Sequence, residues 1–528
     1  MNELPYTQAT NFISAVQGGV DPRTGLFTVN MVLAELTGND NLGPDFLFTL
    51  NYSHLSTSNI CGFGIGCSVG ISIYDKNNKL LILSSGERYK TEDWNDSVYV
   101  RQKKINNFKF EKIKNGYIIK YKNGKTEYLY NYKYGDNLFL PQKIFSPLGW
   151  PLKLTWENRG QYVNLTKIED AKDVLCKIDY QFSDWARITF WPGKTESYTF
   201  QLDFVNEYLY WVTNKSTSRE LVWSFNYDDV GAGNFTLTQV KSPTGLTETV
   251  NYQAGVMRFP DESGKPALPS VYNYRQSPGM GQPDIVKEYE YTVSNYLGYG
   301  ASLGKAWNED EDNIYNVVMD DYTYSSTEKL IVDNRELVSI SRIYNSYYLL
   351  ISETTRQNSC EVIVETDYYA KPGLSFDKQP KQFQLPKEEK KTWRENSKNQ
   401  CRSEITTTTF DPEGNLLTKI EPDGTKTEYI YYDSKGETDK GIVLCPPEPN
   451  GFVRFVKTQI VTPADSEFYA PVQQTTYAYA QYPCIAGSSL SYAVLQTQET
   501  LCSDDVLLLT INTDYIILMI LPSLSTEE

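Results

Sequence analysis

Short segments in which hydrophobic and polar residues alternate run along most of the chain, and turn residues separate them. The clearest example is the stretch 410–437, where two alternating segments, 415–420 and 425–432, follow turns at 411–414 and 422–424. These turns read Asp-Pro-Glu-Gly and Pro-Asp-Gly: proline presets φ, aspartate bonds to its own backbone, and glycine accepts a positive φ. Thr, Ile and Tyr favour pleated strands. The stretch therefore predicts paired short strands that must pack against neighbours, because two strands alone cannot bury a face.

The same pattern restarts at the end of this stretch. Asp411 to Asp433 and Gly414 to Gly436 are each 22 residues apart, and a fixed period of this size is typical of repeat architectures. A phrase in which Thr-Glu follows a glycine turn and precedes an aromatic strand occurs four times, beginning at Gly124, Gly193, Gly245 and Gly424. The spacing is irregular, and chance reuse of common strand residues is the alternative. Four copies favour a repeat whose units vary in length.

Nine residues are expected to carry this repeat in a structural role. They mark the turns and the aromatic positions of the stretch 410–437 and are Phe410, Asp411, Gly414, Gly424, Tyr429, Tyr431, Tyr432, Asp433 and Gly436. The sequence assigns no catalytic residue, no cofactor-binding residue and no metal ligand.

No convincing long helical pattern interrupts the strands, so the predicted fold class is all-β. We expect four or five strands in residues 1–75 and degenerate repeat strands over 76–370. A polar insertion, a loop or short helix, is expected over 371–400, followed by further repeat strands over 401–490. The apolar tail 491–528 is atypical because it holds two β-prone runs without the repeat pattern, and we expect a lost reading frame or a truncation there.

Composition narrows the function classes. The chain has 528 residues and 41 Tyr against 22 Phe, and Tyr suits a strand face that is half apolar and half wet. The net charge is −16 and no long basic run occurs, whereas nucleic-acid binders normally show a basic stripe. We therefore expect no nucleic-acid partner and no attraction to an anionic membrane surface.

Candidate chemical motifs are weak. The glycine-rich segment 62–66 lacks the GxGxxG spacing of a phosphate loop, which favours a bend or close strand packing, and 298–305 lacks the residues of a Walker A loop. The acidic segment 309–313 lacks the central Gly and final Glu of a calcium loop, which favours a solvated loop. The eight Cys form no CxxC pair, and His54 is the only histidine. We expect mostly reduced thiols, no metal, no cofactor and no enzymatic activity.

Targeting signals are also missing from the sequence pattern. Residues 1–12 lack a positive region followed by an apolar core, so no Sec signal peptide is predicted. No apolar run reaches 18 residues, so no transmembrane segment is expected.

The turn-and-aromatic strings resemble the Rhs/YD-repeat family, which includes polymorphic bacterial toxins, the B and C components of insecticidal toxin complexes, and the teneurins. The strings YIYYDSKG at 429–436 and FDPEG at 410–414 are similar to the YD signature of that family. The segments 20–31, 38–53 and 62–66 look like the start of bacterial Rhs proteins. The resemblance extends over about residues 12–480.

The resemblance implies a β-strand ribbon that spirals into a large hollow shell around a toxic C-terminal domain. It implies encapsulation and delivery as the role, with the toxin cargo or other toxin-complex subunits as partners. It also implies export by a route other than Sec, so that the protein is secreted or cell-associated and cytoplasmic before export. The chain departs from the family at Cys67, where relatives usually carry Trp, and at Val32, where they carry Pro. The family's C-terminal core has no counterpart here, so we expect only part of a shell.

Two other functions remain as alternatives. The first is a cell-surface module that binds carbohydrate or protein through exposed Tyr and Trp. The second is a glycosidase with paired carboxylates, which no motif supports among the 66 Asp and Glu. A partial shell leaves strand edges unpaired, so the isolated chain is expected to be poorly soluble or to associate with a partner.

Overall fold

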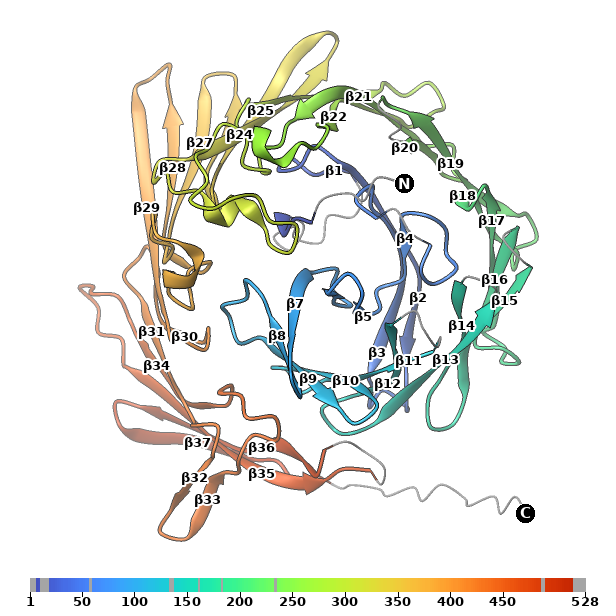
Figure 1. Cartoon of the computed structure of the whole chain (residues 1–528). Coiled ribbons are helices and arrows are strands. Elements are labelled where there is room, and N and C mark those ends of the chain that lie inside the picture. Colours follow the sequence, from blue (N-terminus) through green and yellow to red (C-terminus); the bar gives the residue numbers. More distant parts are fainter. Residues whose placement is uncertain are drawn as a thin grey trace, which may run out of the picture.

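A computed structural model describes residues 6–9, 19–56, 59–132, 137–159, 162–181, 184–231, 235–485 and 490–515. Strands dominate these residues, and the helical elements there include three short 3₁₀ turns, η2 (Asp261–Ser263), η3 (Asn313–Asn316) and η4 (Phe376–Lys378). One long strand ribbon curves around an interior that the N-terminal strands enter (Figure 1). The predicted all-β class is confirmed.

The N-terminal strands are β1 (Gly19–Val20), β2 (Phe27–Thr37), β3 (Asp45–Tyr52), β4 (Cys67–Ser68), β5 (Ile73–Asp75), β6 (Leu80–Ile82), β7 (Arg88–Trp94) and β8 (Ser97–Val100). The first half of the ribbon comprises β9 (Phe108–Ile113), β10 (Gly116–Tyr121), β11 (Thr126–Asn131), β12 (Leu138–Phe145), β13 (Pro151–Arg159), β14 (Tyr162–Glu169), β15 (Val174–Gln181), β16 (Trp185–Phe190), β17 (Tyr198–Val205), β18 (Tyr208–Asn214), β19 (Leu221–Asp229), β20 (Phe235–Lys241), β21 (Thr247–Met257), β22 (Leu268–Ser277) and β23 (Ile285–Tyr291).

The second half comprises β24 (Thr323–Val332), β25 (Arg335–Asn345), β26 (Leu350–Gln357), β27 (Cys360–Tyr368), β28 (Pro386–Glu395), β29 (Gln400–Phe410), β30 (Leu416–Ile420), β31 (Lys426–Tyr431), β34 (Val456–Thr462), β35 (Gln473–Pro483), β36 (Tyr492–Ser503) and β37 (Val506–Asn512). A separate hairpin, β32 (Glu437–Asp439) with β33 (Ile442–Cys445), interrupts the order between β31 and β34.

The ribbon is a meander in which consecutive strands from β9 to β31 pair antiparallel, β31 pairs with β34, and consecutive strands from β34 to β37 pair antiparallel. The chain folds back once, because β12 also pairs with β5 through Leu138–Asp75 and Phe139–Tyr74. Among the described residues β37 pairs with β36 alone. The long sheet therefore closes on itself only around β5–β12 and stays open at β37.

One hairpin turn recurs along the ribbon. The turn has five residues, and the fourth is glycine. The glycine N–H donates to the carbonyl of the first residue, and the N–H of the first residue donates to the carbonyl of the fifth. Each of these glycines has a positive φ, which only glycine adopts without strain. The turns are 83–87, 121–125, 146–150, 242–246, 411–415 and 421–425. Three of the four Thr-Glu phrases begin in such a turn, and the copy at Gly193 uses another, closed by Lys194 N–H to Trp191.

The N-terminal strands fill the inside of the first half of the ribbon. Phe48 of β3 lies edge-on to Phe190 of β16 at 5.3 Å between ring centroids, and both side chains are fully buried. Tyr52 packs on Tyr227 at 5.9 Å and bonds to Thr236 at 3.0 Å. The inner face of β12–β23 is consequently a dry core, rather than the moist Tyr-rich face expected from composition.

The glycine-rich segment 62–66 lies where this inner layer touches the wall. Gly62, Gly64 and Gly66 all have positive φ, and an added Cβ would meet Asn164 at 2.9 Å, the Glu207 carbonyl at 3.1 Å and the Tyr52 ring at 2.7 Å, respectively. Glycine is needed here both for its conformation and for the close approach. The interpretation as close strand packing is confirmed.

Strands β26–β31, in the second half of the ribbon, form a single layer. Across β26–β31 Thr392 is the one residue classed as buried. The polar insertion predicted over 371–400 is wrong for its second part, because 386–395 form β28 between β27 and β29. Its charged residues suit a strand that is wet on both faces, where Lys390 pairs with Glu365 at 3.5 Å.

The apolar tail predicted over 491–528 extends the ribbon as far as it is described. The first of its two β-prone runs forms β37, which pairs with β36, and nearly all of the second run lies in residues 516–528, outside the described part. All seven residues of β37 are exposed, including Val506 at 63% and Leu508 at 58%. An exposed apolar strand at the edge of a sheet is a template for pairing with another chain.

We predict that Leu508→Lys reduces self-association of the chain, because a lysine on an edge strand opposes edge-to-edge pairing. Sedimentation velocity at several protein concentrations should show oligomers for the unmodified chain and a shift towards monomer for the variant. Val293→Lys is the matched control, since Val293 is 73% exposed but lies outside the strands. A monodisperse, unmodified monomer at all concentrations would contradict the prediction.

Candidate functional site

The nine repeat residues lie along successive turns and strands rather than around one cavity. The Asp411 carboxylate accepts the N–H groups of Glu413 at 2.9 Å and Asn415 at 2.8 Å. The Asp433 carboxylate accepts the N–H of Lys435 at 2.8 Å, and the Gly436 N–H bonds to the Asp433 carbonyl at 2.9 Å. Both carboxylates are thus occupied with holding their own turns.

Gly414, Gly424 and Gly436 have φ values of 78°, 94° and 76°. At Gly436 an added Cβ would lie 2.4 Å from the Cys445 carbonyl oxygen. These glycines therefore shape the turns by conformation, and at Gly436 by close contact as well.

The aromatic repeat residues pack between strands. Tyr432 is buried and donates its hydroxyl to the Tyr477 carbonyl at 2.8 Å, and burial raises its pKa to about 12. Tyr431 is partly buried on β31, and burial raises its pKa to about 12. Tyr429 is partly buried on the same strand. Phe410 ends β29 and lies edge-on to Tyr369 at 6.4 Å.

Two loops of the second half, 411–415 and 448–452, contact residues 106–122 in and around β9 and β10, and we call this contact the joint. Lys122 Nζ donates to the Glu413 carbonyl at 2.9 Å and to Asn415 Oδ1 at 2.6 Å. Asn106 donates to the Glu413 carboxylate at 2.7 Å, and Lys109 donates to the Asn450 carbonyl at 2.6 Å. The joint links the start of the ribbon to two loops of its second half through side-chain contacts.

Electrostatics in the joint favour the charged form of Glu413 and disfavour the charged form of Lys122. The hydrogen bond from Asn106 is the main cause that lowers the pKa of Glu413, whereas burial lowers the pKa of Lys122. The second loop is held by Glu448, whose carboxylate accepts two backbone N–H groups, from Asn450 at 2.7 Å and Phe452 at 3.0 Å, and pairs with Arg454 at 3.0 Å. Through Glu413 and Asn415, the repeat turn 411–415 is therefore part of the joint.

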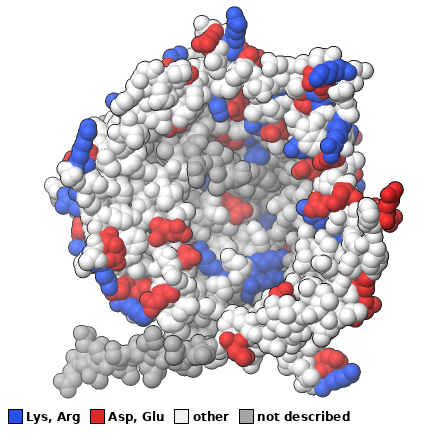
Figure 2. Space-filling model, turned by 180° about the vertical axis from the view of Figure 1, so that it is seen from behind, with Lys and Arg blue, Asp and Glu red and all other residues white. Residues whose placement is uncertain are grey.

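The inner wall of the second half carries a ladder of charges. The Glu328 carboxylate on β24 forms salt bridges with Lys287 at 2.7 Å and with Arg342 at 3.3 Å. Arg342 also forms a salt bridge with Glu353 at 2.8 Å. These groups lie on the face of the sheet that bears the buried Tyr344, which places them on the inside. Figure 2 shows the molecule from behind with a hollowed centre and charged side chains of both signs within it.

Asp312 fastens the N-terminal residues to the wall, and the sequence analysis missed it. Its carboxylate accepts the Gln8 N–H at 2.5 Å and the Tyr348 hydroxyl at 2.7 Å. Complete burial raises the pKa of Asp312 to about 6. The expectation of a solvated acidic loop over 309–313 is therefore wrong at Asp312 and Asn313, which are buried, although Asp310 is solvated and pairs with Lys79 at 2.8 Å. A sequence pattern cannot distinguish these two carboxyls, since only the fold buries one of them.

The groups that could supply metal or thiol chemistry are scattered. Within the described ranges no group of three His, Cys, Asp or Glu is arranged to hold a metal ion. Cys61, Cys67 and Cys176 are buried in the core between the N-terminal strands and the wall, and burial raises the pKa of each thiol, for Cys67 to about 12. His54 is buried too, which lowers its pKa to about 4.

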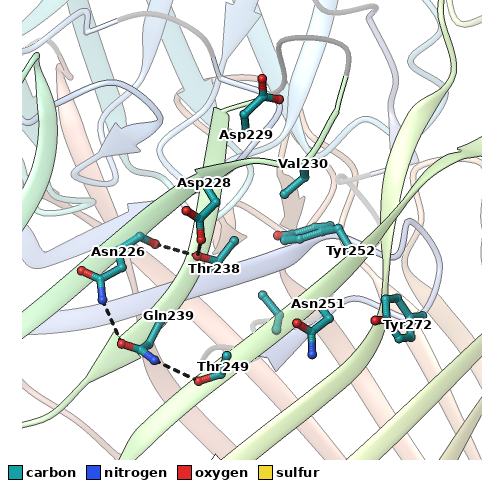
Figure 3. A pocket seen from close by; sticks show the side chains of 11 residues that line it. Asn226, Asp228, Asp229, Val230, Thr238, Gln239, Thr249, Asn251, Tyr252 and Tyr272 are labelled. Carbon is teal, nitrogen blue, oxygen red and sulfur yellow. Dashed lines mark hydrogen bonds between the residues drawn. The ribbon is translucent and has the colours of Figure 1, made fainter.

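A polar pocket of about 390 Å³ lies over β19–β22. Asn226 and Asp228 alternate with Phe225 and Tyr227, which are buried in the core, so the pocket opens on the outer face of the wall. Figure 3 shows its side chains converging from neighbouring strands. The lining residues are Asn226, Asp228, Asp229, Val230, Thr238, Gln239, Thr249, Val250, Asn251, Tyr252 and Tyr272.

No helix within the described residues is long and apolar enough to cross a membrane.

Comparison with known proteins gives no match to a family model or to a curated protein sequence. Among solved structures, the chain is similar to the Photorhabdus luminescens Tc holotoxin pore, with 10% identity and a TM-score of 0.30, over 93% of this chain and 26% of that one. It is also similar to TcdB2–TccC3 without its hypervariable C-terminal region, with 9% identity and a TM-score of 0.31, over 90% and 27%. The chain spans about a quarter of the length of these toxin-complex proteins.

We predict that the Asp312 contact stabilises the fold more at low pH. The folded pKa of about 6 lies above the ordinary 3.8, so stability from this group is complete below about pH 4 and is lost as pH rises through 6. The loss is on the order of 2–3 kcal/mol for a shift of this size. Urea unfolding at pH 4.5 and 7.0 should therefore show that Asp312→Asn removes much of the pH dependence.

Asp310→Asn is the matched control, because the hydrogen bond from Lys79 lowers the pKa of Asp310. The stability that Asp310 contributes is therefore lost as pH falls, the opposite of Asp312. If Asp312→Asn changed the free energy of unfolding equally at both pH values, the protonation of Asp312 would not be coupled to folding.

Proposed function

We propose that the chain is a structural wall segment of an Rhs/YD-repeat toxin, which encapsulates and helps to deliver a toxic C-terminal domain. The observation that carries the proposal is the single-layer wall of β26–β31, which lacks the covering layer that the first half has. A charged ladder lies beside it on the inner face of β23–β26. A hollow lined by polar and charged groups can hold another polypeptide without burying that polypeptide in a core. The toxin cargo and other toxin-complex subunits are the proposed partners.

The proposed role includes no catalysis. The Asp411 and Asp433 carboxylates, which the repeat places most regularly, are committed to backbone N–H groups of their own turns. A general acid or a nucleophile needs a group that is available to a substrate. On the same proposal the protein is secreted or cell-associated by a route other than Sec, and it is cytoplasmic before export.

A cell-surface binding module is the second candidate. The outer pocket over β19–β22 favours it, because this pocket faces away from the interior and is lined by polar side chains and Tyr272. The two roles are compatible, since a wall can enclose on one face and bind on the other.

Size-dependent labelling tests enclosure. Thr355 faces inward, because it pairs with Ile340 on the same face as Tyr344, whereas Thr354 pairs with Ser341 and faces outward. Thr355→Cys and Thr354→Cys would each be made in a background in which the exposed Cys360 and Cys401 are Ser. We predict that a small maleimide labels both cysteines at similar rates, while a 5-kDa polyethylene-glycol maleimide labels the inner one about tenfold more slowly.

The outer cysteine is the control, since it shares the strand, the residue type and the partial burial of the inner one. Equal rates of the large reagent at both positions would show that the wall encloses nothing.

A further inference from the structure

The outer pocket over β19–β22 holds an ordered row of amides and hydroxyls. Asn226 Nδ2 donates to Gln239 Oε1 at 2.8 Å, and Gln239 Nε2 donates to Thr249 Oγ1 at 3.2 Å. The row crosses three adjacent strands, and each contact fixes one side-chain rotamer on the rigid sheet (Figure 3). A site whose polar groups are pre-oriented loses less entropy on binding.

The row keeps hydrogen-bonding capacity for a ligand. An amide side chain offers two N–H donors and an acceptor oxygen, and the contacts within the row use only part of this capacity. Asp228 accepts the Thr238 hydroxyl at 3.0 Å through one carboxylate oxygen, which leaves the other oxygen as an acceptor at the mouth. Donors and acceptors therefore alternate within a few ångströms, as neighbouring hydroxyl groups of a sugar require.

An aromatic ring completes one side of the pocket. Tyr272 is 46% exposed and stands on β22 at the edge of the pocket, next to Asn251 (Figure 3). The register slips between Asn251 and Tyr252, opposite Tyr272, and this bulge adds a residue to β22. Bulges re-aim side chains. The ring offers an apolar face with a polar tip, which suits the C–H face of a pyranose.

The charge of the lining restricts the ligand further. Asp228 and Asp229 are the charged residues among those that line the pocket, and they include no Lys or Arg. A phosphate, a sulfate or an acidic sugar would meet two carboxylates without a counter-charge. Apolar ligands are disfavoured because Val230 and Val250 are the aliphatic side chains in a polar lining.

We propose that this pocket binds a neutral glycan, with one or two sugar units hydrogen-bonded to Asn226, Asp228 and Gln239 and one sugar face against Tyr272. The pocket volume of about 390 Å³ accommodates a ligand of that size. The site lies on the convex face, so it is independent of whether the concave face encloses a cargo. It would give the wall an outward-facing contact with a cell-surface carbohydrate.

Saturation-transfer NMR with neutral disaccharides tests the site on the full chain. The probes are lactose, cellobiose, maltose and N,N′-diacetylchitobiose, each up to about 20 mM, with trilysine as a cationic probe. We expect at least one disaccharide to bind with a Kd of about 1 mM, typical of a small shallow site. Tyr272→Ala and Gln239→Leu should each weaken this binding by about tenfold or more.

Tyr99→Ala is the control, because Tyr99 is a similarly exposed tyrosine on β8, away from the pocket. It should change the Kd by less than about twofold. The proposal is overturned if no disaccharide binds, if Tyr272→Ala binds the sugar as well as the unmodified chain does, or if trilysine binds and the sugars do not.

Discussion

The burial of the N-terminal strands against the inner face of β12–β23 is the interaction on which the rest of the structure depends. A single antiparallel layer buries no face of its own, so it needs a second layer to gain hydrophobic stabilisation. Phe27, Phe48 and Phe63 supply that layer from inside the curve, and they are almost completely buried. The wall curves around these residues, and the glycines at 62–66 allow the backbone to approach it closely.

Strands β26–β31 have no such layer and are held mainly by polar contacts, whereas Tyr324 of β24 and Tyr344 of β25 belong to a second buried cluster. Asp312 ties residues 7–8 to Tyr348, the joint ties β9–β11 to the turn 411–415, and charged pairs bridge the strands between them. Asp312 and Tyr348 are buried, but the charged pairs between strands are partly exposed, and such pairs contribute little each. A wall stabilised in this way stays open on its inner face, which is the property that the enclosing role requires.

The sequence predicted the fold class and much of the local structure because these depend on short-range patterns. The segments predicted as strands over 415–420 and 425–432 form β30 and β31, and the turns at 411–414 and 422–424 form where Asp, Pro and Gly place them. The strand β28 was missed, since its charged residues favour a loop unless both faces of the sheet are wet. Whether the repeats belong to the YD family stays a prediction, and so do the domain boundaries other than that of the insertion 371–400.

The candidate sites were harder to predict because they depend on register. Asn226, Gln239 and Thr249 are ordinary strand residues in the sequence, and they meet only because β19, β20 and β21 pair as they do. Likewise, Asp312 differs from Asp310 by its burial against residues 304 positions away. Neither feature has a local signature.

Hydrogen–deuterium exchange of the intact protein tests the central claim most directly. Amides of β2, β3 and β13–β18 should exchange slowest and share one opening free energy, because they form one core. Amides of β26–β31 should exchange at least about tenfold faster, despite their complete backbone ladder, because no second layer covers them. Equal protection of β26–β31 and β13–β18 would contradict the account, since the inner layer would then not be what stabilises the wall.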